Sequence, residues 1–105
     1  MTVQYRKITA MEARVIMKRN PNAIILDVRS EYEFNTCRIP GATLLPDYDI
    51  RDRAGHILPN LNATILVYCK AGSRSRVAAK ELVSMGYTNV YDFGGINTWP
   101  YEILE

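Results

Sequence analysis

The sequence predicts an α/β domain in which a five-stranded parallel sheet is covered by helices, in three α/β/α layers. Short apolar runs rich in β-branched residues alternate with segments of helical periodicity along the chain. The run TILVY at 64–68 has no polar alternation, which is typical of a strand buried on both faces. Because 105 residues is the size of one domain, a single domain is expected over residues 1–105.

The first half of the chain is expected to hold three strands and two helices. Strands are predicted over three short apolar runs: Val3 to Ile8, Ala23 to Val28 and Ala42 to Leu45. Two patterns of Ser or Thr followed by Glu three residues later predict capping boxes, at Thr9 to Glu12 and at Ser30 to Glu33. The first helix should run through Lys18 and end at Asn20-Pro21, and the second should stop before Pro40-Gly41.

The second half begins with a stretch, Pro46 to Leu61, that lacks clear periodicity and is expected to be irregular. A strand over Thr64 to Tyr68 is followed by the strongest helical pattern, Ser73 to Met85, with Gly86 as a left-handed C-cap. The apolar stripe of that helix comprises Val77, Ala78, Leu82, Val83 and Met85. A fifth strand is predicted over Val90 to Phe93, and a terminal helix over Ile96 to Leu104, interrupted at Pro100.

Composition excludes several classes of function. The net charge is only +2, which predicts no general attraction to nucleic acid or to a membrane surface. Two cysteines, Cys37 and Cys69, without a CxxC pattern, are too few for a disulfide scaffold or a zinc site. No apolar run is long enough to span a bilayer. We therefore expect a cytoplasmic protein with reduced thiols and no metal or organic cofactor.

The segment between the fourth strand and the strongest helix carries the clearest chemical signal. Cys69 ends the most apolar strand, and a turn containing Ala71-Gly72 leads into the helix. Unpaired backbone N–H groups at a helix start carry partial positive charge and cradle anions. This helix start also has Arg74 and Arg76, with Lys70 upstream, where acidic residues are usual. The pattern predicts a nucleophilic thiolate, although a small buried cysteine ending a core strand is the structural alternative.

Four segments, in the right order, resemble the single-domain rhodanese-like sulfurtransferases. They are similar to the family patterns DVR, EFxxGHIPGA, CRxGxRS and GGxxxW, and are Asp27 to Arg29, Glu33 to Ala42, Cys69 to Ser75 and Phe93 to Trp99. Two departures stand out, because Cys37-Arg38 replaces the usual Gly-His and Lys70 replaces an Arg that often follows the cysteine. The resemblance implies strand order 1-5-4-2-3, which makes the second and fourth strands neighbours at a topological switch point.

The implied topology divides the candidate residues by role. Cys69 is the catalytic residue, and the anion-binding loop comprises Lys70, Ala71, Gly72, Ser73 and Arg74. Supporting residues at the same crevice are Asp27, Arg29, Ser75, Arg76, Gly94 and Gly95. Arg74 either attracts the substrate or braces the loop, and both roles stay open. Cys37 is placed at the opposite edge of the sheet as a bystander thiol, so no Cys37–Cys69 disulfide is expected.

The reaction implied by the resemblance moves a sulfane sulfur from a donor such as thiosulfate, through a Cys69 persulfide, to a thiol or cyanide acceptor. The implied partners are a small anionic donor and an acceptor thiol, for example on a thioredoxin-like or sulfur-relay protein. Cys-dependent phosphatases and arsenate reductases share this fold type, but phosphatases use Cys-x5-Arg, and that position here is Ser75. A regulatory or docking module without catalysis is the third possibility.

Overall fold

The computed structural model describes residues 4–105 and contains a five-stranded, all-parallel sheet in the order β1-β5-β4-β2-β3, as predicted. The strands are β1 (Arg6–Lys7), β2 (Ile24–Asp27), β3 (Thr43–Leu44), β4 (Ile65–Cys69) and β5 (Val90–Gly95). The first strand is shorter than the predicted Val3 to Ile8, of which Val3 lies outside the described residues. With β4 at its centre, the sheet brings the ends of β2, β4 and β5 to one edge.

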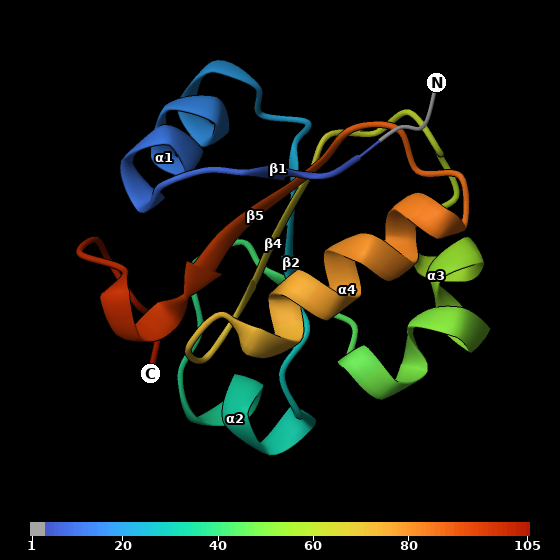
Figure 1. Cartoon of the computed structure of the whole chain (residues 1–105). Helices are drawn as coiled ribbons and strands as arrows, with labels where there is room; N and C mark the ends of the chain where they lie inside the picture. The colour runs from blue at the N-terminus through green and yellow to red at the C-terminus, as the bar shows by residue number, and fades with distance from the viewer. Residues whose placement is uncertain (1–3) are drawn as a thin grey trace.

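Helices cover both faces of this sheet (Figure 1). They are α1 (Ala10–Arg19), α2 (Glu31–Thr36), α3 (Ile50–Ile57) and α4 (Ser73–Ser84), with 3-10 turns η1 (Asp47–Asp49) and η2 (Ile96–Thr98). In Figure 1, α1 and the C-terminal segment lie on one side of the strands, and α3 and α4 lie on the other. The short helix α2 lies past the ends of β2 and β4, which places it beside the start of α4.

The central strand divides the core between these two layers. Alternate residues of a strand point to opposite faces, so Val67 and Cys69 pack with the α3 and α4 layer. Leu66 and Tyr68 pack instead with Ala13 of α1 on the other side. Every residue of β4 is buried, which explains its unbroken apolar sequence.

Both predicted capping boxes are present. The Thr9 hydroxyl accepts from the Glu12 N–H at 3.1 Å, and the Glu12 carboxylate accepts from the Thr9 N–H at 2.9 Å. The Ser30 hydroxyl and the Glu33 carboxylate form the same reciprocal pair at the start of α2. The predicted left-handed glycine after α4 is also confirmed, because Gly86 has φ +104°.

Two predicted segments differ from the structure. The stretch Pro46 to Leu61 is not irregular, because η1 and α3 occupy most of it. Its buried face repeats every four residues at Ile50, Ala54 and Leu58, a periodicity masked in the sequence by the charged residues between them.

The predicted terminal helix over Ile96 to Leu104 is also wrong. Only η2 forms, because Pro100 lacks the N–H that a helix requires and holds Trp99 in an extended conformation. The chain instead returns to pair Leu104 with Arg38 in an antiparallel bridge. In α4, Val77 does not belong to the buried stripe, since it is 61% exposed, and Ala79 is buried instead.

Candidate active site

A cysteine lies at the base of the loop that joins β4 to α4. We call residues Cys69 to Ser73 the cysteine loop. Cys69 is fully buried at the end of β4, and the backbone N–H of Gly72 donates to its Sγ atom at 3.0 Å. Gly72 has φ +106°, a left-handed conformation that favours glycine, and α4 starts at the next residue. The sulfur therefore faces a backbone donor at the positive end of a helix whose first turn has no acidic residue.

The end of β5 forms a second wall of the cysteine loop. The Asn97 N–H donates to the Lys70 carbonyl at 3.1 Å. Gly95 leaves no room for a side chain, because an ideal Cβ would lie 2.7 Å from the Ala71 Cα. Gly72 similarly faces Gly94 across the loop. The prediction that Gly94 and Gly95 lie on the same side as Cys69 is confirmed.

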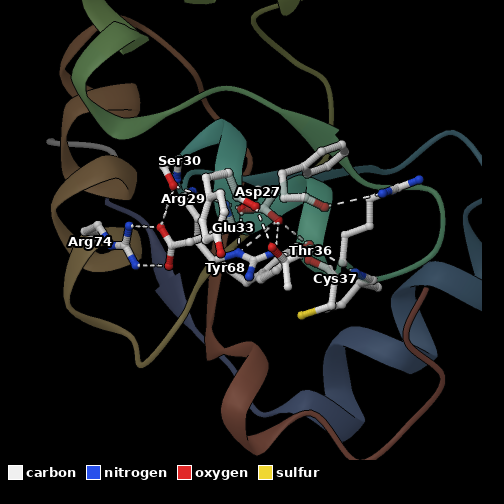
Figure 2. A network of polar contacts seen from close by, with 12 residues as sticks. Asp27, Arg29, Ser30, Glu33, Thr36, Cys37, Tyr68 and Arg74 are labelled. Atoms are coloured by element: carbon white, nitrogen blue, oxygen red, sulfur yellow. Dashed lines mark hydrogen bonds and ion pairs between the residues drawn. The ribbon is translucent and has the colours of Figure 1, made fainter. Parts of the chain in front are cut away.

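Arg74 braces α4 against α2. Its guanidinium donates to both carboxylate oxygens of Glu33, at 2.7 and 2.9 Å, as Figure 2 shows. This bidentate bond from Arg74 is the main reason that the pKa of Glu33 falls to about 2, although burial partly opposes it. Hydrogen bonding to Glu33 is also the main reason that the pKa of Arg74 is raised. Of the two roles left open for Arg74, bracing is the one seen here, because its Nη1 and Nη2 atoms both donate to Glu33.

In the Glu33→Gln variant, the free energy of unfolding should fall less at acid pH than it does in the wild type. The folded protein holds the Glu33 pKa below its ordinary 4.5, so this pair stabilises the fold above pH 4.5 and the contribution is lost as the pH falls toward 2. Because both side chains are partly exposed, we expect a contribution of about 1 kcal/mol, measured by urea unfolding at a series of pH values. Glu31→Gln on the same helix is the control. A Glu33→Gln profile parallel to that of the wild type would contradict this assignment.

A buried polar cluster joins β2 to β4 (Figure 2). The Asp27 carboxylate accepts from the Arg29 guanidinium at 2.7 Å and from the Tyr68 hydroxyl at 2.6 Å. Burial by itself would lower the pKa of Arg29, but Asp27 outweighs it and the pKa is raised. Burial, and then the bond to Asp27, raise the pKa of Tyr68. Asp27 and Arg29 therefore hold the end of β2 to β4 and to the segment after α2.

The placement of Cys37 at the opposite edge of the sheet is wrong. The segment after α2 pairs with the C-terminal segment through Arg38 and Leu104, and Arg29 Nη2 donates to the Cys37 carbonyl at 2.6 Å. Cys37 lines a cavity of about 200 Å³ together with Arg29, Lys70 and Asn97. Cys37 and Cys69 are both free thiols.

The other predicted residues divide into buried and exposed groups. The Ser75 hydroxyl is buried and donates to Asp92 Oδ1 at 2.8 Å. Lys70, Ala71, Ser73 and Arg76 are exposed. Sequence reasoning did not select Asp92 or Tyr68 as site residues. A signal for Asp92 was available, because a carboxylate inside the apolar strand VYDF is expensive unless it has a specific task.

Neither a cluster of metal-ligating side chains nor a helix able to cross a membrane occurs among the described residues. Within residues 4–105, no three His, Cys, Asp or Glu side chains are grouped so that they could hold a metal ion. In the same range, no helix is both long enough and apolar enough to cross a membrane.

The fold and the site define a class of α/β protein in which a buried cysteine ends the central strand and lies under the loop that starts the next helix. A family model described as rhodanese-like domain matches residues 9–101. The chain therefore belongs to the rhodanese-like domain family.

Relatives of two sizes match this chain. Thiosulfate sulfurtransferase PspE of Escherichia coli K12 is 35% identical over 71 residues, which cover 68% of each chain. Thiosulfate sulfurtransferase GlpE of Pseudomonas entomophila is 31% identical over 97 residues, covering 91% of this chain and 85% of the relative. The match to adenylyltransferase and sulfurtransferase UBA4 of Meyerozyma guilliermondii is 33% identical and covers 81% of this chain but only 22% of that longer protein.

Solved structures agree on the fold. A rhodanese-related protein from Thermoplasma volcanium superposes with a TM-score of 0.82 at 28% identity, covering 95% of this chain and 98% of that one. The human single-domain sulfurtransferase TSTD1 gives a TM-score of 0.77 at 25% identity, with 89% and 92% coverage.

Proposed function

We propose that this protein is a sulfurtransferase that moves a sulfane sulfur from a small anionic donor, through a persulfide on Cys69, to a thiol acceptor. The observation that carries this proposal is the Gly72 N–H, which lies 3.0 Å from Cys69 Sγ at the start of α4. Two relatives of similar size are named thiosulfate sulfurtransferases, which supports the reaction class. The four residues between Cys69 and Arg74 also make a shorter loop than the Cys-x5-Arg of phosphatases.

The first step loads sulfur onto the enzyme. The Cys69 thiolate attacks the outer sulfur of thiosulfate and forms a new S–S bond. The S–S bond of thiosulfate breaks, and sulfite leaves with its electron pair. The total charge is unchanged, since a thiolate and thiosulfate become a persulfide anion and sulfite. No metal, oxidant or cofactor enters this step.

The residues of the cysteine loop would stabilise the persulfide and bring in the donor. The Gly72 N–H and the positive end of α4 face the negative sulfur, as donors of an oxyanion hole face oxygen. Lys70 is exposed at the rim and attracts the anion. Cys69 itself is buried, whereas Lys70, Ala71 and Ser73 of the loop are exposed. Arg74 is assigned to bracing, because Glu33 holds its guanidinium.

The second step returns the enzyme to its starting state. An acceptor thiolate attacks the outer sulfur, a persulfide forms on the acceptor, and the Cys69 thiolate leaves. Cyanide can take the same sulfur in vitro and become thiocyanate. The acceptor is a thiol, which a thioredoxin-like or sulfur-relay protein would supply.

Intact mass measurement tests this function. After thiosulfate treatment, the reduced protein should gain one sulfur atom, and cyanide should remove it. The Cys69→Ser variant should gain none and should lose sulfur transfer by about a thousandfold or more. Cys37→Ser is the matched control and should still gain the sulfur.

Other outcomes of the same experiment point elsewhere. Hydrolysis of a phosphate monoester, or reduction of arsenate, without any gain of sulfur would indicate a Cys-dependent phosphatase or an arsenate reductase, respectively. Absence of both activities, together with slow alkylation of Cys69, would indicate a docking module and overturn the proposal.

A further inference from the structure

Asp92 is a buried carboxylate next to the cysteine loop. It lies in β5 and is fully buried. Its Oδ1 atom accepts from the Ser75 hydroxyl at 2.8 Å and from the Gly94 N–H at 2.9 Å. Its Oδ2 atom has no hydrogen-bond partner within the described residues. The cation that faces it is Lys7, whose Nζ lies 3.7 Å from Oδ2.

This arrangement compensates the carboxylate only in part. A buried carboxylate normally needs a close counter-charge and donors on both oxygens. Here both donors converge on Oδ1, and the Lys7 side chain is 64% exposed, so its ammonium is mostly hydrated. A buried polar group that is incompletely compensated calls for a task beyond stability.

The two donors to Asp92 come from opposite sides of the cysteine loop. Ser75 belongs to the first turn of α4, whereas Gly94 belongs to the end of β5. The Ser75 oxygen also lies 3.2 Å from the Gly72 carbonyl and 3.3 Å from the Gly94 carbonyl. A hydroxyl has one proton, and the carboxylate is its nearest and strongest acceptor. Asp92 thereby joins the start of α4 to the end of β5.

Gly72 lies between these two attachments. Its N–H donates to Cys69 Sγ, and an added Cβ on Gly72 would lie 3.7 Å from the Gly94 Cα. The direction of this N–H therefore depends on how the start of α4 is held against β5. A small rotation of the first turn would lengthen the bond to sulfur, because a hydrogen bond weakens steeply with misalignment.

We propose that Asp92 is a positioning residue, which acts through Ser75 and Gly94 to hold the Gly72 N–H toward the Cys69 sulfur. The inference rests on the proposed function, in which that sulfur reacts. Asp92 acts by the position of its Oδ1 acceptor, and an amide oxygen at the same place can accept the same two donors. Asparagine at position 92 should therefore preserve this role, whereas alanine should abolish it.

The test compares four variants by the rate at which iodoacetamide alkylates Cys69, followed by peptide mass spectrometry so that Cys37 is counted separately. Asp92→Ala and Ser75→Ala should each slow alkylation by about tenfold, the effect of losing one hydrogen bond to a charged sulfur. Asp92→Asn should stay within about threefold of the wild type. The double variant Asp92→Ala/Ser75→Ala should be no slower than Asp92→Ala, because both changes break one connection.

Controls separate positioning from loss of the fold. Unfolding is measured in parallel, and alkylation is compared only where each variant is folded. Ser84→Ala, in the last turn of the same helix, should alkylate at the wild-type rate. Three outcomes would each overturn the inference. Folded Asp92→Ala could alkylate at the wild-type rate, the two effects could add in the double variant, or Asp92→Asn could be slowed as much as Asp92→Ala.

The proposed sulfurtransferase function and the positioning role of Asp92 are tested by different measurements. Gain of sulfur from thiosulfate by the wild type reports the reaction, whereas the pattern of alkylation among the variants reports the positioning role. If the wild type gained no sulfur but the variants showed the expected alkylation pattern, the proposed reaction would be refuted and the positioning role of Asp92 would stand.

Discussion

The Arg29→Met variant is expected to lose about 3–5 kcal/mol of its free energy of unfolding, measured by urea or guanidinium denaturation. Arg29 is 3% exposed, and its partner Asp27 is fully buried. Removing the guanidinium leaves the Asp27 carboxylate in the core without a counter-charge, and only the Tyr68 hydroxyl and a backbone N–H remain to donate to it. The bond from Arg29 to the Cys37 carbonyl is lost as well.

A double variant distinguishes the lost charge pair from lost packing. In Asp27→Asn/Arg29→Met, the amide oxygen can still accept from Tyr68, and no unpaired charge remains in the core. We expect this double variant to recover a large part of the lost stability, as buried pairs replaced by neutral groups commonly do. A double variant less stable than Arg29→Met would contradict the electrostatic explanation.

Gly95→Ala is expected to destabilise the fold by about 3 kcal/mol and to displace the cysteine loop. The backbone of Gly95 is extended, with φ −123°, so any residue could adopt its conformation. The obstacle is steric, because the added Cβ would meet the Lys70 carbonyl and would lie 2.7 Å from the Ala71 Cα. Both contacts are backbone atoms of the loop, which can relieve them only by moving.

This displacement should be visible in two measurements. Denaturation gives the loss of stability, and the rate of Cys69 alkylation reports the changed loop. Gly55→Ala is the matched control, since an added Cβ there meets nothing within 4 Å and lies on the exposed side of α3. That control should be more stable than the wild type by about 0.5–1 kcal/mol, because alanine favours a helix more than glycine. Equal stability of both variants would contradict the steric argument.

The errors in predicting the fold have physical causes that can be assigned to particular residues. Within Pro46 to Leu61, Gly55 and the charged residues hide an apolar residue at every fourth position. That apolar face forms a helix because the rest of the fold buries it. The terminal helix was placed across Pro100, where the missing N–H excluded it. Val77 fits a helical stripe, but the direction in which α4 packs leaves it exposed.

The sequence by itself determined the features that depend on neighbours a few residues apart. Both capping boxes join residues three positions apart, and the buried β4 follows from one uninterrupted apolar run. The cysteine, the turn and the helix start are contiguous, so the loop could be recognised without the rest of the chain.

Only the tertiary structure decided what each polar side chain of the site faces. Arg74 meets Glu33 across 41 residues of sequence, and Ser75 meets Asp92 across 17. Cys37 lines the same cavity as Lys70 and Asn97, which come from distant parts of the chain. Such pairings depend on the order of strands and the direction of helix packing, which bring distant residues within hydrogen-bond range. Local sequence does not encode those distances, so only the fold paired Arg74 with Glu33 and placed Asp92 beside the cysteine loop.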